Sequence, residues 1–98
     1  AMAAQAVIWH PEAQEDYRDI VSYFLEEWSF EVADKFTSQV DEVVNLLQSH
    51  PNIGMRVGRL RSVRKIAVPP HYFLYYIFFQ NQILVFNILD NRQKPESL

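Results

Sequence analysis

The hydrophobic period of the chain changes near residue 50, and this change constrains the fold more than any other feature. Before it, apolar residues recur every three or four positions, as they do on one face of a helix. After it, β-branched and aromatic residues dominate, as they do in strands. The segment His50–Gly54 separates the halves with a proline and a glycine, which is typical of a helix end. The sequence therefore predicts helices followed by a sheet.

Two helices are expected in the first half of the chain. Pro11 suits the first turn of the first helix, because a residue there needs no backbone N–H. The apolar face of this helix consists of Ala13, Tyr17, Ile20, Val21, Phe24 and Trp28. Ser29 is a suitable N-cap for the second helix, and the short connection predicts an antiparallel helical hairpin. The apolar face of the second helix consists of Val32, Phe36, Val40, Val43, Val44 and Leu47.

One short strand is expected before the helices and three after them. The expected strands are Gln5–Trp9, Val63–Val68, Tyr72–Phe79 and Ile83–Leu89. The polar segment Arg56–Arg64 is expected to begin as a loop, and Gln80–Gln82 gives a weak hairpin signal. The order β-α-α-β-β-β predicts an α+β fold in which an antiparallel sheet packs against the helical hairpin. Residues 1–98 are expected to form a single domain.

The last two expected strands are apolar on both faces, because side chains alternate along a strand. One face of Tyr72–Phe79 carries Tyr72, Leu74, Tyr76 and Phe78, and the other carries Phe73, Tyr75, Ile77 and Phe79. Alternation along Ile83–Leu89 groups Ile83, Val85 and Leu89 against Leu84, Phe86 and Ile88. The helical hairpin can cover only one face, so the other predicts an interaction site. A protein partner, including a second copy of the chain, is favoured over cover by the tail or the basic segment.

The charges of the chain are divided between its halves. Residues 1–50 carry ten acidic and two basic residues, whereas residues 51–98 carry two acidic and seven basic residues. Five of the bases are clustered, namely Arg56, Arg59, Arg61, Arg64 and Lys65. Such a cluster can bind phosphate, an acidic protein segment or the acidic helices of a neighbouring subunit, or it can form a solvated loop. The acidic overall balance argues against tight, nonspecific binding of nucleic acid.

The sequence carries no pattern typical of a metal, cofactor or nucleophile site. It has no cysteine, which excludes disulfides and thiolate metal sites. Its three histidines are far apart and lie beside prolines, so turn positions explain them. Its two glycines do not form a phosphate-binding loop. No membrane-spanning run or signal peptide is visible. We therefore expect a cytoplasmic protein that does not bind a membrane, a metal ion or a cofactor.

Several segments together resemble the RelE/ParE toxin superfamily. They are Ile8–Ala13, the helical hairpin, His50–Gly54, Tyr72–Tyr76 and Asn91–Pro95. The similarity covers nearly the whole chain and is carried by the order and spacing of the segments. It implies a bacterial or archaeal toxin of a toxin–antitoxin module, often described as a plasmid stabilisation system, which a small antitoxin holds inactive. RelE-type members of the superfamily cut messenger RNA on the ribosome, whereas ParE-type members inhibit DNA gyrase and are not nucleases.

The resemblance is closer to the ParE branch than to the RelE branch. RelE-type cleavage relies on basic strand residues and usually on a tyrosine near the C-terminus. The family commonly has arginine where Phe73 stands, and polar residues and Leu98 stand here in place of the tail tyrosine. If the chain is a nuclease, the resemblance leaves Arg64, Lys65 and Arg92 as its catalytic candidates.

The favoured hypothesis is a ParE-like toxin that inhibits DNA gyrase by binding, without being an enzyme, and is neutralised by a cognate antitoxin. The residues expected to bind the partner or target are Arg56, Arg59, Arg61, Arg64, Lys65, Tyr72, Tyr76 and Arg92. The expected assembly is a hetero-oligomer with the antitoxin, and a homodimer when the toxin is alone. Two alternatives stay open: a RelE-like, ribosome-dependent endoribonuclease, and a non-toxic relative that acts as a binding module.

Overall fold

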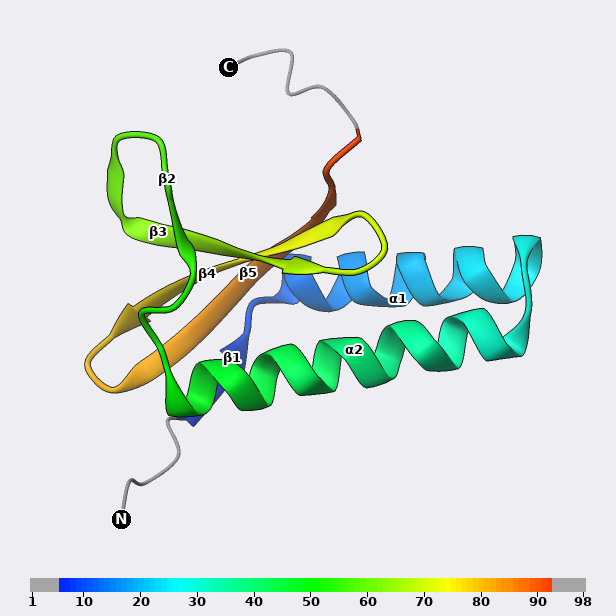
Figure 1. Ribbon diagram of the computed structural model, residues 1–98, viewed down its shortest axis with the longest axis horizontal. Helices are drawn as coiled ribbons and strands as arrows, with labels where there is room; N and C mark the ends of the chain where they lie inside the picture. Colours follow the sequence, from blue (N-terminus) through cyan, green and yellow to red (C-terminus); the bar gives the residue numbers. More distant parts are fainter. Residues whose placement is uncertain (1–5, 93–98) are drawn as a thin grey trace.

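Two helices cover one face of a five-stranded sheet in the computed structural model of the chain (Figure 1). The structure describes residues 6–92, except for the side chains of Leu60 and Arg61. The elements are β1 (Ala6–Trp9), α1 (Pro11–Glu27), α2 (Phe30–Ser49), β2 (Met55–Val57), β3 (Leu60–Val68), β4 (Tyr72–Phe79) and β5 (Gln82–Asp90). The predicted α+β fold, with a helical hairpin against a sheet, is therefore confirmed. No helix within the described part is long and apolar enough to cross a membrane.

The two helices form the antiparallel hairpin that the sequence predicts (Figure 1). The Ser29 hydroxyl accepts a hydrogen bond from the Val32 backbone N–H at 3.2 Å, which confirms Ser29 as the N-cap of α2. The buried helical residues are Ala13, Phe24, Ala33, Phe36, Val40 and Leu47. Trp28 departs from the prediction, because it lies in the turn after α1, where helical spacing no longer applies, and is 66% exposed.

The basic segment after α2 folds as a β-hairpin and not as the expected loop. β2 pairs antiparallel with β3, so that Arg56 lies opposite Arg64. Gly58 adopts a φ of 53° in the connecting turn, which is a backbone conformation that favours glycine. β3 begins at Leu60, earlier than the predicted start at Val63. The sequence missed β2 because strand formation in so short and polar a segment depends on its neighbours.

The order of the strands in the sheet is β1-β5-β4-β3-β2. β3, β4 and β5 are joined by turns and pair antiparallel, as expected, and β2 adds a further antiparallel pair with β3. Gln80 and Asn81 form the β4–β5 turn with φ values of 51° and 62°, which confirms the weak hairpin signal. β1 instead pairs parallel with β5, so the sheet is mixed and not wholly antiparallel. No hairpin joins these two strands, so no turn fixes their relative direction.

A β-bulge at Phe86 changes the face assignment at the end of β5. The register shifts between Tyr75 and Tyr76 of β4, which leaves Phe86 as an extra residue. Beyond the bulge, Ile88 is 2% exposed and Leu89 is 46% exposed. Alternation along an unbroken strand predicts the opposite for this pair. That prediction is wrong because one extra residue shifts the alternation by one position.

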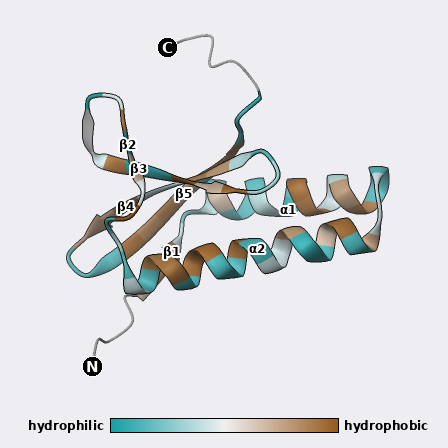
Figure 2. Ribbon diagram, viewed as in Figure 1, coloured by the Kyte–Doolittle hydropathy of each residue, from teal (hydrophilic) through white to brown (hydrophobic). Residues whose placement is uncertain are grey.

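The core lies between the helical hairpin and the inner face of the sheet. Apolar residues form a stripe on each helix and fill β4 and β5 (Figure 2). The rings of Phe24, Phe36 and Tyr72 form a cluster, with centroid distances between 5.4 and 6.2 Å. Because the helices occupy only this side of the sheet, the apolar side chains of the opposite side are left without helical cover.

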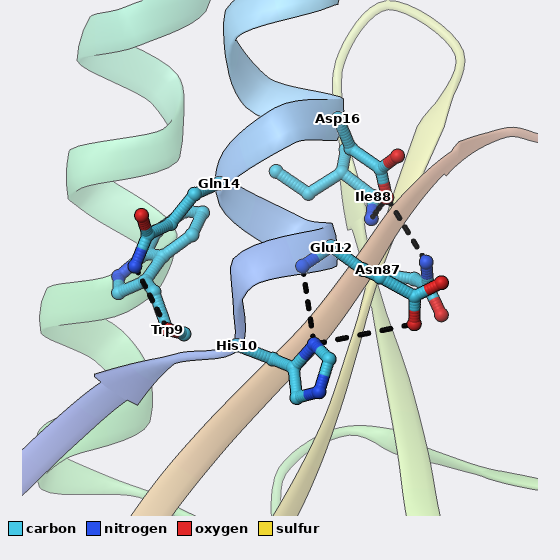
Figure 3. A network of polar contacts seen from close by, with 7 residues as sticks. All are labelled: Trp9, His10, Glu12, Gln14, Asp16, Asn87 and Ile88. Carbon is cyan, nitrogen blue, oxygen red and sulfur yellow. Dashed lines mark hydrogen bonds and ion pairs between the residues drawn. The ribbon is translucent and has the colours of Figure 1, made fainter.

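Polar side chains at the start of α1 attach this helix to both β1 and β5 (Figure 3). The Gln14 side-chain amide donates to the Trp9 carbonyl at 3.0 Å. The Asp16 Oδ2 atom accepts hydrogen bonds from Asn87 Nδ2 and from the Ile88 backbone N–H, both at 3.0 Å. These bonds lie just after the bulge, where β1 no longer pairs with β5. The carboxylate therefore takes the place of a neighbouring strand.

Candidate functional site

The face of the sheet opposite the helices is an apolar surface, which we call the outer face. It consists of Ile8, Met55, Val63, Lys65, Ala67, Phe73, Tyr75, Ile77, Phe79, Leu84, Phe86 and Leu89. Phe79 is 67% exposed, and Ile8 and Leu89 are 44% and 46% exposed. Contiguous apolar surface of this kind marks an interaction site. The expectation that one apolar face of the sheet escapes the helices is confirmed within residues 6–92.

Lys65 carries the one charge of the outer face among the described side chains. Its Nζ atom lies 4.3 Å from the centroid of the Phe73 ring, which is a cation–π contact. The backbone register places Lys65 opposite Tyr75, so the ammonium group lies among aromatic rings. Among the described side chains, a ligand of this face therefore meets rings and a single cation.

Arg64 lies on the inner face and holds the turn between α2 and β2. Its Nη1 atom donates to the carbonyl oxygens of Asn52 and Gly54 at 3.0 and 2.7 Å. Lys65 is the next residue in the strand, and consecutive side chains of a strand point to opposite faces. Arg64 and Lys65 therefore cannot act on the same bound group, although both are candidates from the sequence.

Two tyrosines that the sequence places at the binding surface are buried in the core. Tyr76 is fully buried, and its hydroxyl donates to the Pro51 carbonyl at 2.8 Å and accepts from the Gly54 N–H at 2.9 Å. Burial raises the pKa of the Tyr76 phenol. Tyr72 is 6% exposed and packs against Phe36. Both serve the fold, because the helices cover the face that carries them, which alternation alone does not reveal.

Arg92 lies just beyond β5 in a cluster with Asp90 and His71. Its Nε and Nη2 atoms lie 3.2 and 3.0 Å from the two Asp90 carboxylate oxygens, and its backbone N–H donates to the same carboxylate at 2.8 Å. The side-chain hydrogen bonds hold the pKa of Asp90 below its usual range and raise the pKa of Arg92. The His71 Nε2 atom lies 3.7 Å from Asp90 Oδ2. The charge of Arg92 is thus matched by a carboxylate.

The candidate cations of a nuclease lie at different levels of the sheet. Asp90, which holds Arg92, pairs with Tyr72 at the start of β4. Arg64 pairs with Tyr76, further along the same strand. Four residues of a strand span about 13 Å, at about 3.3 Å per residue. The structure therefore does not bring these cations to one point.

The β2–β3 hairpin carries cations that are free to bind. Arg56 and Arg59 are exposed, and neither forms a hydrogen bond or ion pair within the described part of the chain. Arg61 is expected to join them, but its side chain lies outside the described residues. The basic cluster of the sequence is thus divided among the hairpin, the inner face and the outer face.

The histidines occupy turns, as expected. His10 caps α1, His50 follows α2, and His71 lies between β3 and β4. Among residues 6–92, no group of three or more histidine, aspartate or glutamate side chains could hold a metal ion.

A family model matches nearly the whole chain. Residues 7–95 match the model of the ParE toxin of the type II toxin-antitoxin system, parDE. The chain belongs to the ParE toxin family. The resemblance to the RelE/ParE superfamily is thereby confirmed, and the protein is a toxin of a type II toxin–antitoxin system. No curated protein sequence matches the chain significantly.

Solved structures share the fold of this ParE-family toxin. A chain of the chromosomal ParDE TA system from P. aeruginosa has a TM-score of 0.74 at 20% identity, over 89% of this chain and 96% of that chain. The YoeB dimer from Staphylococcus aureus has a TM-score of 0.64 at 19% identity, over 87% and 94%. The YoeB/ParE toxin from Agrobacterium tumefaciens has a TM-score of 0.64 at 9% identity, over 87% and 96%. At these identities, the likeness establishes the fold alone.

Two acidic residues of the toxin have roles that sequence reasoning missed. Asp90 orients Arg92, and the spacing of this pair at a strand end is a signal that could have indicated the contact. Asp16 binds the backbone of Ile88, a residue 72 positions away. No local signal in the sequence links that pair.

Proposed function

We propose that this toxin inhibits DNA gyrase by binding, without cutting RNA, and that a cognate antitoxin neutralises it by covering the outer face. The outer face is the observation that carries the proposal. It is an apolar surface of half-buried and exposed rings with one cation, Lys65, among its described side chains. Surfaces that bind single-stranded nucleic acid combine rings with a cationic groove that follows the phosphates. A surface with so little charge suits a protein partner.

The placement of the cations supports a mechanism without catalysis. Cleavage of a phosphodiester needs cationic and proton-transferring groups directed at one phosphate. Arg64 binds two loop carbonyls, and Lys65 points to the opposite face of the sheet. Arg92 is held by Asp90 at the far end of β5. These groups do not converge, so we infer that the toxin acts by occupying a surface of its target.

The target of this toxin is expected to meet the exposed cations of the β2–β3 hairpin. In a gyrase supercoiling assay, purified toxin should inhibit at micromolar concentration. The Arg56→Glu/Arg59→Glu variant should need at least a tenfold higher concentration, because both free guanidinium groups are reversed. Arg18→Glu/Lys35→Glu is the matched control, since both residues are exposed on the helices and the change in charge is equal. Normal supercoiling at high concentrations of the wild-type toxin would contradict the proposal.

A RelE-like endoribonuclease is the second candidate, and one cluster favours it. His71, Asp90 and Arg92 bring together an imidazole, a carboxylate and a guanidinium. If this cluster cuts RNA, Arg92→Ala should abolish message cleavage in a translating extract while circular dichroism stays unchanged. Absence of cleavage by the wild-type protein would remove this candidate. Robust growth of cells that overexpress soluble protein would instead leave a non-toxic binding module.

The antitoxin is expected to bury Phe79 and its neighbours on the outer face. The probe is the product of the small reading frame beside the toxin gene, titrated against purified toxin. Phe79→Ser should weaken binding at least tenfold, because a buried ring contributes about 1.5–3 kcal/mol. Leu46→Ser, which changes an exposed apolar residue of α2, is the control. Equal losses for both variants would place the antitoxin elsewhere, without affecting the supercoiling result.

A further inference from the structure

Two surfaces near opposite ends of the molecule carry opposite charges. The first, which we call the acidic tip, is the end of the helical hairpin and consists of Leu25, Glu26, Glu27, Trp28, Phe30 and Glu31. The second, which we call the basic turn, belongs to the β2–β3 hairpin and consists of Arg56 and Arg59. In Figure 1 the basic turn lies at the upper left and the acidic tip at the right.

The acidic tip exposes large apolar side chains beside its charges. Trp28 and Phe30 at the acidic tip are 66% and 68% exposed, and Leu25 is 50% exposed. Met55 of β2 is 60% exposed and pairs with Lys65, so it belongs to the outer face and not to the basic turn. None of these side chains belongs to the core. A contact between the two surfaces would therefore bury apolar area as well as pair charges.

The charges of both surfaces lack counter-ions within the described chain. Ion pairs among residues 6–92 join His10 to Glu12, and Asp90 to His71 and Arg92. The carboxylates of the acidic tip and the guanidinium groups of the basic turn take no part in them. The same division holds for the whole sequence, where the first 50 residues are strongly acidic and the remainder is basic.

We propose that a second copy of the chain pairs these surfaces in a two-fold dimer, with the acidic tip of each copy against the basic turn of the other. Half a turn about the viewing axis of Figure 1 exchanges the two ends of the molecule. Two copies placed side by side in this way make the same contact twice, as a closed two-fold arrangement requires. Because the acidic tip and the basic turn carry opposite charges, a second copy of this chain is the partner that fits both surfaces.

The contact is small, which sets its expected strength. Two patches of roughly 400 Å² each give about 800 Å² in total, below the size of a standard stable interface. The dimer should therefore form at micromolar concentrations and weaken with salt, because exposed charges are screened. It hides Arg56 and Arg59, so dimer formation and target binding through the basic turn exclude each other. The dimer itself does not rest on the proposed action on gyrase.

Sedimentation velocity of the toxin, purified apart from its antitoxin, tests the dimer. A concentration series should show monomer–dimer exchange at about 0.1 M salt and a dissociation constant at least tenfold higher at about 1 M salt, where the screening length falls from about 10 Å to about 3 Å. Trp28→Ala should also weaken the dimer. A monomer throughout the series would overturn the proposal, and so would a dimer that is insensitive to salt and lost in Phe79→Ser, which would place the contact on the outer face.

Charge reversal identifies the two surfaces. Glu26→Lys/Glu27→Lys and Arg56→Glu/Arg59→Glu should each weaken self-association at least tenfold. A mixture of the two variants should form a heterodimer, since each contact then joins opposite charges. Because only folded proteins can form this heterodimer, its formation also shows that both variants fold. Glu15→Lys/Glu42→Lys changes the net charge equally, at exposed helical positions away from the tip, and should leave the dimer intact. Failure of the mixture to associate, or equal weakening by the control, would overturn the proposal.

Discussion

The Tyr76 hydroxyl oxygen lies 2.9 Å from the Gly54 amide nitrogen and accepts its hydrogen bond. The same hydroxyl donates to the Pro51 carbonyl, and Arg64 binds the Gly54 carbonyl. Side chains from β3 and β4 therefore hold the turn that carries the chain from the helical hairpin into the sheet. The turn is the only covalent link between the helical hairpin and β2, so its geometry positions the basic hairpin that follows.

Removal of this hydroxyl should destabilise the toxin. Tyr76→Phe leaves the Gly54 N–H and the Pro51 carbonyl without their partner, and an unsatisfied buried group costs about 1–3 kcal/mol. We expect the free energy of unfolding, measured with urea, to fall by about 2 kcal/mol. Tyr75→Phe makes the same chemical change on the outer face and should cost less than about 0.5 kcal/mol. Similar losses in both variants would contradict a structural role for the Tyr76 hydroxyl.

A side chain at Gly54 should collide with the same tyrosine. A Cβ atom there would lie 2.5 Å from Tyr76 Oη and 2.7 Å from Tyr76 Cε1. We expect Gly54→Ala to cost about 1–3 kcal/mol through overpacking. In the Tyr76→Phe background the oxygen is absent, so the cost of Gly54→Ala should fall by at least about 0.5 kcal/mol. Gly58→Ala, which meets no atom within 4 Å, should cost the same in both backgrounds.

The Asp16 carboxylate should stabilise the junction between α1 and β5. Asp16→Ala removes the acceptor of the Ile88 N–H and the Asn87 amide, and we expect a loss of about 1–2 kcal/mol in the free energy of unfolding. Asp19→Ala, at an exposed position of the same helix, should change it by less than about 0.5 kcal/mol. Hydrogen exchange at Ile88 gives a local reading, and unchanged protection there in Asp16→Ala would argue against this account.

The pairing of Asp90 with Arg92 should make stability depend on acid pH. The pKa of Asp90 is lowered in the folded protein, so its ionised form stabilises the fold at pH values above the ordinary value of about 4. This contribution is lost as the pH falls through the lowered pKa. Asp90→Asn should therefore be less stable than the wild type near neutral pH, and the difference should shrink below about pH 4. Urea midpoints measured across this range test the prediction, and a difference that does not change with pH would refute it.

The helices and the central strands of the sheet were predictable because their signals are local. Helical spacing and the Ser29 cap identify α2, and the uniformly apolar segment Tyr72–Phe79 coincides with β4. β2 carries no such signal, since its three residues pair only because β3 lies beside them. The bulge at Phe86 also has no local signal in the sequence, because it arises from the register between two strands.

The candidate site was predictable as a surface but not as a set of contacts. Both faces of β4 are apolar and the helices can cover only one of them, so one apolar face stays uncovered whichever face the helices pack against. Which face they cover is decided by packing, and that decision buries Tyr72 and Tyr76 and places Arg64 against a turn. The basic cluster was visible as composition, whereas its division among three surfaces depends on the alternation along β3 and on the fold of the hairpin.

The parallel pairing of β1 with β5 joins segments that are made at different times during synthesis. Ala6–Trp9 is made before the helices, yet its neighbour in the described part of the sheet is Gln82–Val85, which is made after the helices and after β2, β3 and β4. Contacts so distant in sequence form slowly, because a long loop must close before they stabilise the fold. β1 can therefore pair in the sheet only after β5 has been made, and a chain interrupted before residue 82 cannot complete this edge of its sheet.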